Sequence, residues 1–213
     1  MSLQRPEQER GEQVNDAKFV LPLDALHRDS LALVGGKAAN LGELISAGLP
    51  VPPGFCITTM AYEMVALEAG LEVILNARSG DSGHLAESAR NCLLAASMPA
   101  RVVEAITEAY RVLGAGEPIP VAVRSSATAE DLPFASFAGQ QDTYLNTVGI
   151  EALLDAVRHC WASLWTDRAV GYRASLGIDQ HSVRLAVVVQ RVIESSVSGV
   201  LFTANPVTGK RRQ

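Results

Sequence analysis

VAVRSSATAEDLPFASFAGQQDTYLN, residues 121–146, is the segment around which the rest of the chain is organised. It begins with the apolar run 121–123, which contains two valines and is typical of a buried strand. Arg124 follows this run directly, and the small residues 135–139 indicate a loop. Residues 141–147 predict a second strand. The stretch therefore predicts two strands joined by a polar loop, with Arg124 at the end of the first strand.

An arginine beside a loop rich in hydroxyls and glycine suits a polyanion. The guanidinium offers a planar fork of donors, and the hydroxyls of Ser125, Ser126 and Thr128 can donate to phosphate oxygens. Free backbone N–H groups in such a loop add further donors. The same hydroxyls can instead cap their own backbone. A polar hairpin with an exposed arginine fits these residues equally well, and composition alone does not separate the two interpretations.

The composition of the whole chain is that of a folded globular protein. The 213 residues are 48% hydrophobic and 19% charged, and the net charge of −5 argues against a nucleic-acid partner. No apolar run approaches the roughly 20 residues that span a bilayer, and the polar first residues do not resemble a secretory signal. Cys56, Cys92 and Cys160 are far apart in apolar surroundings, which predicts reduced thiols and favours the cytoplasm.

The remaining sequence alternates between helical and extended patterns. Residues 1–18 are polar and have no regular spacing of apolar residues, which predicts a disordered tail. Apolar spacing predicts helices over 38–47, 62–67, 85–96, 101–113 and 150–164 and another starting at 166–167, and strands over 19–26, 55–57, 184–193 and 197–204. The short connection between the last two predicts adjacent antiparallel strands.

A second candidate anion site lies near the start of the chain. Gly35 and Gly36 predict a tight turn that opens the helix 38–47, and Lys37 lies at the mouth of this turn. The first turn of a helix favours anions. The spacing differs from that of a Walker-type P-loop. A solvated lysine beside a structural turn is the alternative.

Three stretches, in the same order, resemble one protein family. VGGKAANLGELISAGLPVPPGFCITTMAY (34–62), VRSSATAEDLPFASFAGQQDTYLN (123–146) and QRVIESSVSGVLFTANPVTG (190–209) resemble the ATP-binding domain of the phosphoenolpyruvate synthase and pyruvate phosphate dikinase family, which includes the rifamycin phosphotransferases. The resemblance implies an α+β, ATP-grasp-like fold. Residues 19–213 would form the N-terminal portion of that domain, with a largely helical sub-lobe at about 19–117 and a second sub-lobe with mixed or antiparallel strands at 118–213.

The resemblance also implies roles for five residues. Arg124 would hold the ATP phosphates and act in catalysis by offsetting charge that develops during transfer. Lys37 would contact the phosphates, Gly139 would lie in the loop over them, and Thr143 would contact the nucleotide. Gln190 would lie beside the adenine, where an amide offers both a donor and an acceptor. Taken without the resemblance, Thr143 and Gln190 fit ordinary polar positions on strands.

The activity implied by the resemblance is ATP-dependent phosphoryl transfer. ATP would phosphorylate a carrier histidine, which passes the group to pyruvate; the alternatives are a rifamycin phosphotransferase or a non-catalytic binding module. The chemistry implies Mg²⁺, whose ligands we expect beyond the end of this chain, together with the carrier-histidine and acceptor-binding domains. We expect no nucleic-acid or membrane partner and no transfer activity from this chain alone.

Overall fold

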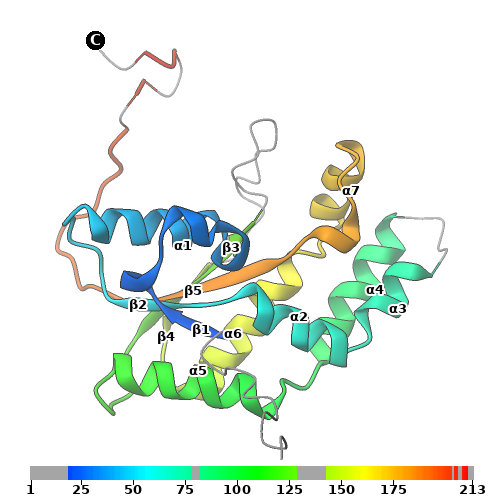
Figure 1. Cartoon of the computed structure of the whole chain (residues 1–213), viewed down its shortest axis with the longest axis horizontal. Helices are drawn as coiled ribbons and strands as arrows, with labels where there is room; N and C mark the ends of the chain where they lie inside the picture. The colour runs from blue at the N-terminus through cyan, green and yellow to red at the C-terminus, as the bar shows by residue number, and fades with distance from the viewer. Residues whose placement is uncertain (1–18, 78–81, 129–142, 203, 206–207, 211–213) are drawn as a thin grey trace, which may run out of the picture.

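The computed structural model describes residues 19–77, 82–128, 143–202, 204–205 and 208–210. The predicted disordered tail and Gly139 lie outside this part of the chain. The described residues form an α+β arrangement with an antiparallel sheet (Figure 1). No described helix is long and apolar enough to cross a membrane.

The sheet has the strand order β1-β2-β5-β3-β4, and each neighbouring pair is antiparallel. Its strands are β1 (Val20–Pro22), β2 (Gly54–Ile57), β3 (Val121–Ala127), β4 (Thr143–Thr147) and β5 (Leu185–Arg191). Because β5 lies between β2 and β3, strands from both predicted sub-lobes belong to one sheet.

Apart from one short helix, the helices lie where the spacing of apolar residues predicts them. They are α1 (Leu31–Ser46), α2 (Thr59–Glu68), α3 (Leu71–Asn76), α4 (Ser82–Ala95), α5 (Ala100–Leu113), α6 (Ile150–Ser163) and α7 (Asp167–Ser175), with 3-10 turns at Leu23–Ala25, Arg28–Ser30 and Gln180–Ser182. Helix α3 was not predicted. It is a short helix separated from α2 by Gly70, whose φ is 75°.

Two predictions for the strands were wrong. Residues 197–202 form no strand and are exposed, because β5 pairs with β2 on one side and β3 on the other and has no edge left for a hairpin partner. Arg124 lies inside β3 and not at its end. The strand continues to Ala127 because residues 125–127 keep their pairing with β5.

The sheet separates two hydrophobic cores. Along β5, Leu185, Val187 and Val189 belong to the larger core, whereas Ala186 and Val188 belong to the smaller one. The larger core includes buried residues of α2, α4, α5 and α6, and the smaller core includes those of α1. Figure 1 shows α1 on one side of the sheet and α5 and α6 on the other. This alternation is the period of two expected for a strand buried on both faces.

Helix α1 is interrupted where the sequence predicts a tight turn. Gly35 has φ 72° and ψ 171°, which is not helical. In a regular helix the N–H of Ala38 would donate to the carbonyl of Val34. Here Ala38 N–H donates to Ser126 Oγ (3.2 Å), and the same hydroxyl donates to the carbonyl of Val34 (2.8 Å). A side chain of β3 thus replaces one hydrogen bond of the helix, which is a known cause of kinks.

The carbonyls in the first turn of α1 have other partners from the sheet side. Cys56 Sγ donates to the carbonyl of Val34 at 3.7 Å. Burial raises the pKa of this thiol, so the sulfur keeps its proton. Thr59 Oγ1 donates to the carbonyl of Ala32 at 3.3 Å. The Val34 carbonyl thus accepts from two side chains, Ser126 and Cys56, and the Ala32 carbonyl accepts from Thr59.

The kink predicts an unusual sensitivity at Gly35. A Cβ at this position would lie 2.2 Å from the carbonyl oxygen of Ser126, whereas a Cβ at Gly48, with a similar φ of 75°, would meet nothing within 4 Å. We expect Gly48→Ala to cost about 1–2 kcal/mol from its left-handed backbone alone. We expect Gly35→Ala to lower the free energy of unfolding by about 1–3 kcal/mol more. Urea unfolding measures both variants, and equal losses would contradict the close packing at Ser126.

The larger core predicts a second pair of stability effects. Leu153 on α6 is fully buried, whereas Leu67 on α2 is 75% exposed. Leu153→Ala removes buried methyl groups and leaves a cavity, so it should lower the free energy of unfolding by about 2–5 kcal/mol. The control Leu67→Ala should change it by less than about 0.5 kcal/mol. Thermal or urea unfolding provides the comparison, and a small loss for Leu153→Ala would argue against the core assigned to α6.

Candidate phosphate-binding face

Arg124 and Ser126 lie on the face of the sheet that α1 covers. Side chains two residues apart on a strand share a face. The register pairs Arg124 with Val188 and Ser126 with Ala186. Both partners on β5 belong to the smaller core, which also contains buried residues of α1. The side chain of Arg124 therefore emerges on the α1 side of the sheet.

Thr143 and Gln190 share this face. Thr143 on β4 is paired with Arg124, and Gln190 on β5 is paired with Ala122, which lies two residues before Arg124. Lys37 follows the kink of α1, directly before Ala38. The fold thus brings four of the five predicted site residues to one side of the sheet, while Gly139 lies outside the described residues.

The two cationic residues are differently placed. Arg124 is exposed, and none of the carboxylates in the described part of the chain pairs with it. Lys37 is half-buried between Gly36 and Ala38, which are both buried. The helical part of α1 that continues after Gly35 presents the positive end of its dipole near Lys37. Both positions favour an anion.

The hydroxyls after Arg124 serve the fold. Ser125 is buried and, by alternation, points to the opposite face of β3. The hydroxyl of Ser126 makes two hydrogen bonds with the backbone of α1. Thr128 Oγ1 donates to the backbone carbonyl of Arg184 at 3.4 Å. Ser126 and Thr128 thus donate to backbone carbonyls 92 and 56 residues away and do not cap their own backbone.

Gln190 is only 6% exposed and holds the connector before β2. Its Nε2 donates to the carbonyl of Pro52 at 3.1 Å. A Cβ on the paired residue Gly54 would lie 2.2 Å from the carbonyl oxygen of Val189, so the two strands approach closely here. A primary amide has two N–H donors and one carbonyl acceptor. The bond to Pro52 uses one of these donors and leaves capacity for a ligand.

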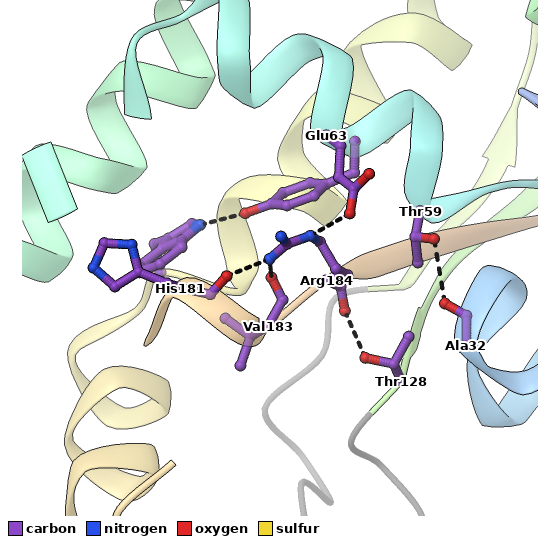
Figure 2. A network of polar contacts seen from close by, with 9 residues as sticks. Ala32, Thr59, Glu63, Thr128, His181, Val183 and Arg184 are labelled. Atoms are coloured by element: carbon purple, nitrogen blue, oxygen red, sulfur yellow. Dashed lines mark hydrogen bonds and ion pairs between the residues drawn. The ribbon is translucent and has the colours of Figure 1, made fainter. Parts of the chain in front are cut away.

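A hollow of about 380 Å³ lies elsewhere, between α2, α3 and the turn Gln180–Ser182. Figure 2 shows the guanidinium of Arg184 directed toward Glu63 and toward the carbonyls of His181 and Val183. The Nε of Arg184 lies 2.5 Å from Glu63, and Nη1 donates to the two carbonyls at 2.6 and 3.0 Å. The charged groups that line this hollow pair with one another. It is therefore a weaker candidate for binding a polyanion than the face of the sheet that α1 covers.

The described residues hold no cluster of metal-ligating side chains. No three His, Cys, Asp or Glu side chains gather to hold an ion within this part of the chain.

The residue that sequence reasoning missed is Ser126 as a partner of α1. Its two hydrogen bonds join positions 88 and 92 residues apart. The glycine pair and the serine pair are both visible in the sequence, but nothing in either pattern indicates that they touch.

Comparison with known proteins identifies the family. The sequence profile of the family described as "Pyruvate phosphate dikinase, AMP/ATP-binding domain" matches residues 31–213. A phosphoenolpyruvate synthase of Aeropyrum pernix is 48% identical over 207 residues, covering 92% of this chain and 25% of the relative. Rifampicin phosphotransferases of a Streptomyces species and of Bacillus cereus are 48% and 43% identical, each covering 92% of this chain and 23% of the relative.

The chain therefore spans about a quarter of the length of these curated relatives. Because the profile matches the chain from α1 to its last residue, the chain belongs to the pyruvate phosphate dikinase AMP/ATP-binding domain family.

Proposed function

We propose that this chain is the N-terminal part of an ATP-grasp-like nucleotide-binding domain and that its α1 face binds the phosphates of ATP. The observation that carries the proposal is the presence of Lys37 and Arg124 on the same side of the sheet, one at the kink of α1 and one on β3. The family of AMP/ATP-binding domains supports the same ligand.

The two cations would act in different ways. The guanidinium of Arg124 can form two parallel hydrogen bonds to one phosphate and can stabilise negative charge on a transferring phosphoryl group. The ammonium of Lys37 acts as a compact charge beside the helix end. Thr143 adds a hydroxyl next to Arg124, and the amide of Gln190 is suited to the adenine edge. The contribution of these residues to transfer is positioning and electrostatic stabilisation.

For the whole protein we propose phosphoryl transfer from ATP to a carrier histidine and then to pyruvate. Support comes from the relative named phosphoenolpyruvate synthase. A rifampicin phosphotransferase is the second candidate, because a relative of that name is equally identical, at 48%. Mg²⁺ would accompany ATP, with ligands outside the residues placed here. The three cysteines are free, which suits a reducing cytoplasm.

The phosphate site predicts a specific loss of affinity. In calorimetric titration of the chain with MgATP, Lys37→Ala and Arg124→Ala should each weaken binding by roughly ten- to a hundredfold, because each removes one charge-assisted phosphate contact. Arg111→Ala is the matched control. Its side chain is 60% exposed on α5 and pairs with Glu108. It removes the same charge from the opposite side of the sheet and should leave affinity within about twofold, apart from weak screening effects.

Two outcomes would contradict this proposal. Absence of MgATP binding by a folded wild-type chain would show that the α1 face alone does not form a nucleotide site. Equal losses for Arg124→Ala and Arg111→Ala would show that only net charge matters.

A further inference from the structure

We propose that Ser126 is a positioning residue for the nucleotide phosphates and that it acts through Lys37. Its buried hydroxyl would fix the kink of α1 so that the ammonium of Lys37 reaches the same phosphates as Arg124. The inference rests on the proposed function, since it names a residue that organises that site without touching the ligand.

The burial of Ser126 excludes a direct contact with ATP. Its side chain is 0% exposed. A serine hydroxyl has one donor and two acceptor positions, and both kinds are used: it donates to Val34 and accepts from Ala38. Both of these hydrogen bonds of the hydroxyl are made with residues of α1.

The two hydrogen bonds clamp the segment that carries Lys37. Val34 and Ala38 stand on either side of the triplet Gly35-Gly36-Lys37, so a single atom of β3 holds both ends of the turn. The turn cannot close into a regular helix while this hydroxyl lies between them. Without the hydroxyl, Ala38 N–H and the Val34 carbonyl can bond directly, which would rotate Lys37 about the helix axis.

Ser126 also sets the distance between the two cations. Arg124 lies two residues away on the same face of β3, and this strand is paired with β5 along its whole length. Removal of the Ser126 hydroxyl should therefore move Lys37 and leave Arg124 in place. This asymmetry distinguishes a positioning role from a general loss of stability.

The test is a double-mutant cycle for MgATP affinity, measured by calorimetry. Ser126→Ala is made in the wild-type, Lys37→Ala and Arg124→Ala chains. We expect a loss of roughly tenfold in the wild-type and Arg124→Ala backgrounds, and no further loss in the Lys37→Ala background, because residues that act through one another are not additive. Ser163→Ala is the control. It removes a buried hydroxyl that donates to the carbonyl of Cys160 on α6, and it should leave affinity unchanged.

A ligand-free measurement accompanies the cycle. Amide hydrogen exchange at residues 34–38 should differ between Ser126→Ala and the wild type, because Ala38 N–H loses the Ser126 hydroxyl as its hydrogen-bond partner. Circular dichroism during heating confirms that each variant is folded at the titration temperature.

Several results would contradict the positioning role of Ser126 or the clamp on the turn. An equal affinity loss in all three backgrounds, or no loss in the wild type, would overturn the positioning role. Unchanged hydrogen exchange at 34–38 would overturn the clamp itself. If the folded wild-type chain does not bind MgATP, the proposed function fails and the positioning role fails with it, while hydrogen exchange still decides whether the clamp exists.

Discussion

The hydroxyl of Ser126, inserted between Val34 and Ala38, is the constraint on which the candidate site depends. It interrupts α1 and ties the helix to β3. It also explains the requirement for glycine at position 35, where any Cβ would collide with the backbone of Ser126. A kinked helix is costly unless its freed polar groups find partners. Here the partners come from β3, β2 and the start of α2, so the kink is part of the packing of α1 on the sheet.

The contact between Ser126 and α1 is supported by the pairing of β3 within the sheet. Strand β5 is buried on both faces and paired on both edges, and its register with β3 places Arg124 and Gln190 on the α1 side. The start of β3 is held by the hydroxyl of Tyr110 on α5, which donates to the carbonyl of Ile119 (2.7 Å) and accepts from the N–H of Ile119 (3.1 Å) and of Gly149 (2.9 Å). The larger core therefore fixes the strand from one side, while the other side is left for α1 and a ligand.

Much of this arrangement follows from local patterns. The apolar periods locate the longer helices, and the turn at Gly35 is visible in the glycine pair because only a glycine adopts such a backbone easily. Non-local relations do not follow from such patterns. Residues 197–202 have the composition of a strand, yet both edges of β5 are already occupied by β2 and β3. The bond from Ser126 to Val34 depends on how β3 and α1 pack, and no local pattern in the sequence reveals it.

Nucleotide binding on the α1 face of the sheet can be mapped residue by residue with backbone amide NMR on the ¹⁵N-labelled chain titrated with MgATP. We expect the largest shifts to cluster at residues 34–38 and 124–126 and at Thr143 and Gln190, which come from four separate elements of the fold. Shifts that instead cluster around Glu63, His181 and Arg184, at the hollow between α2 and α3, would contradict it.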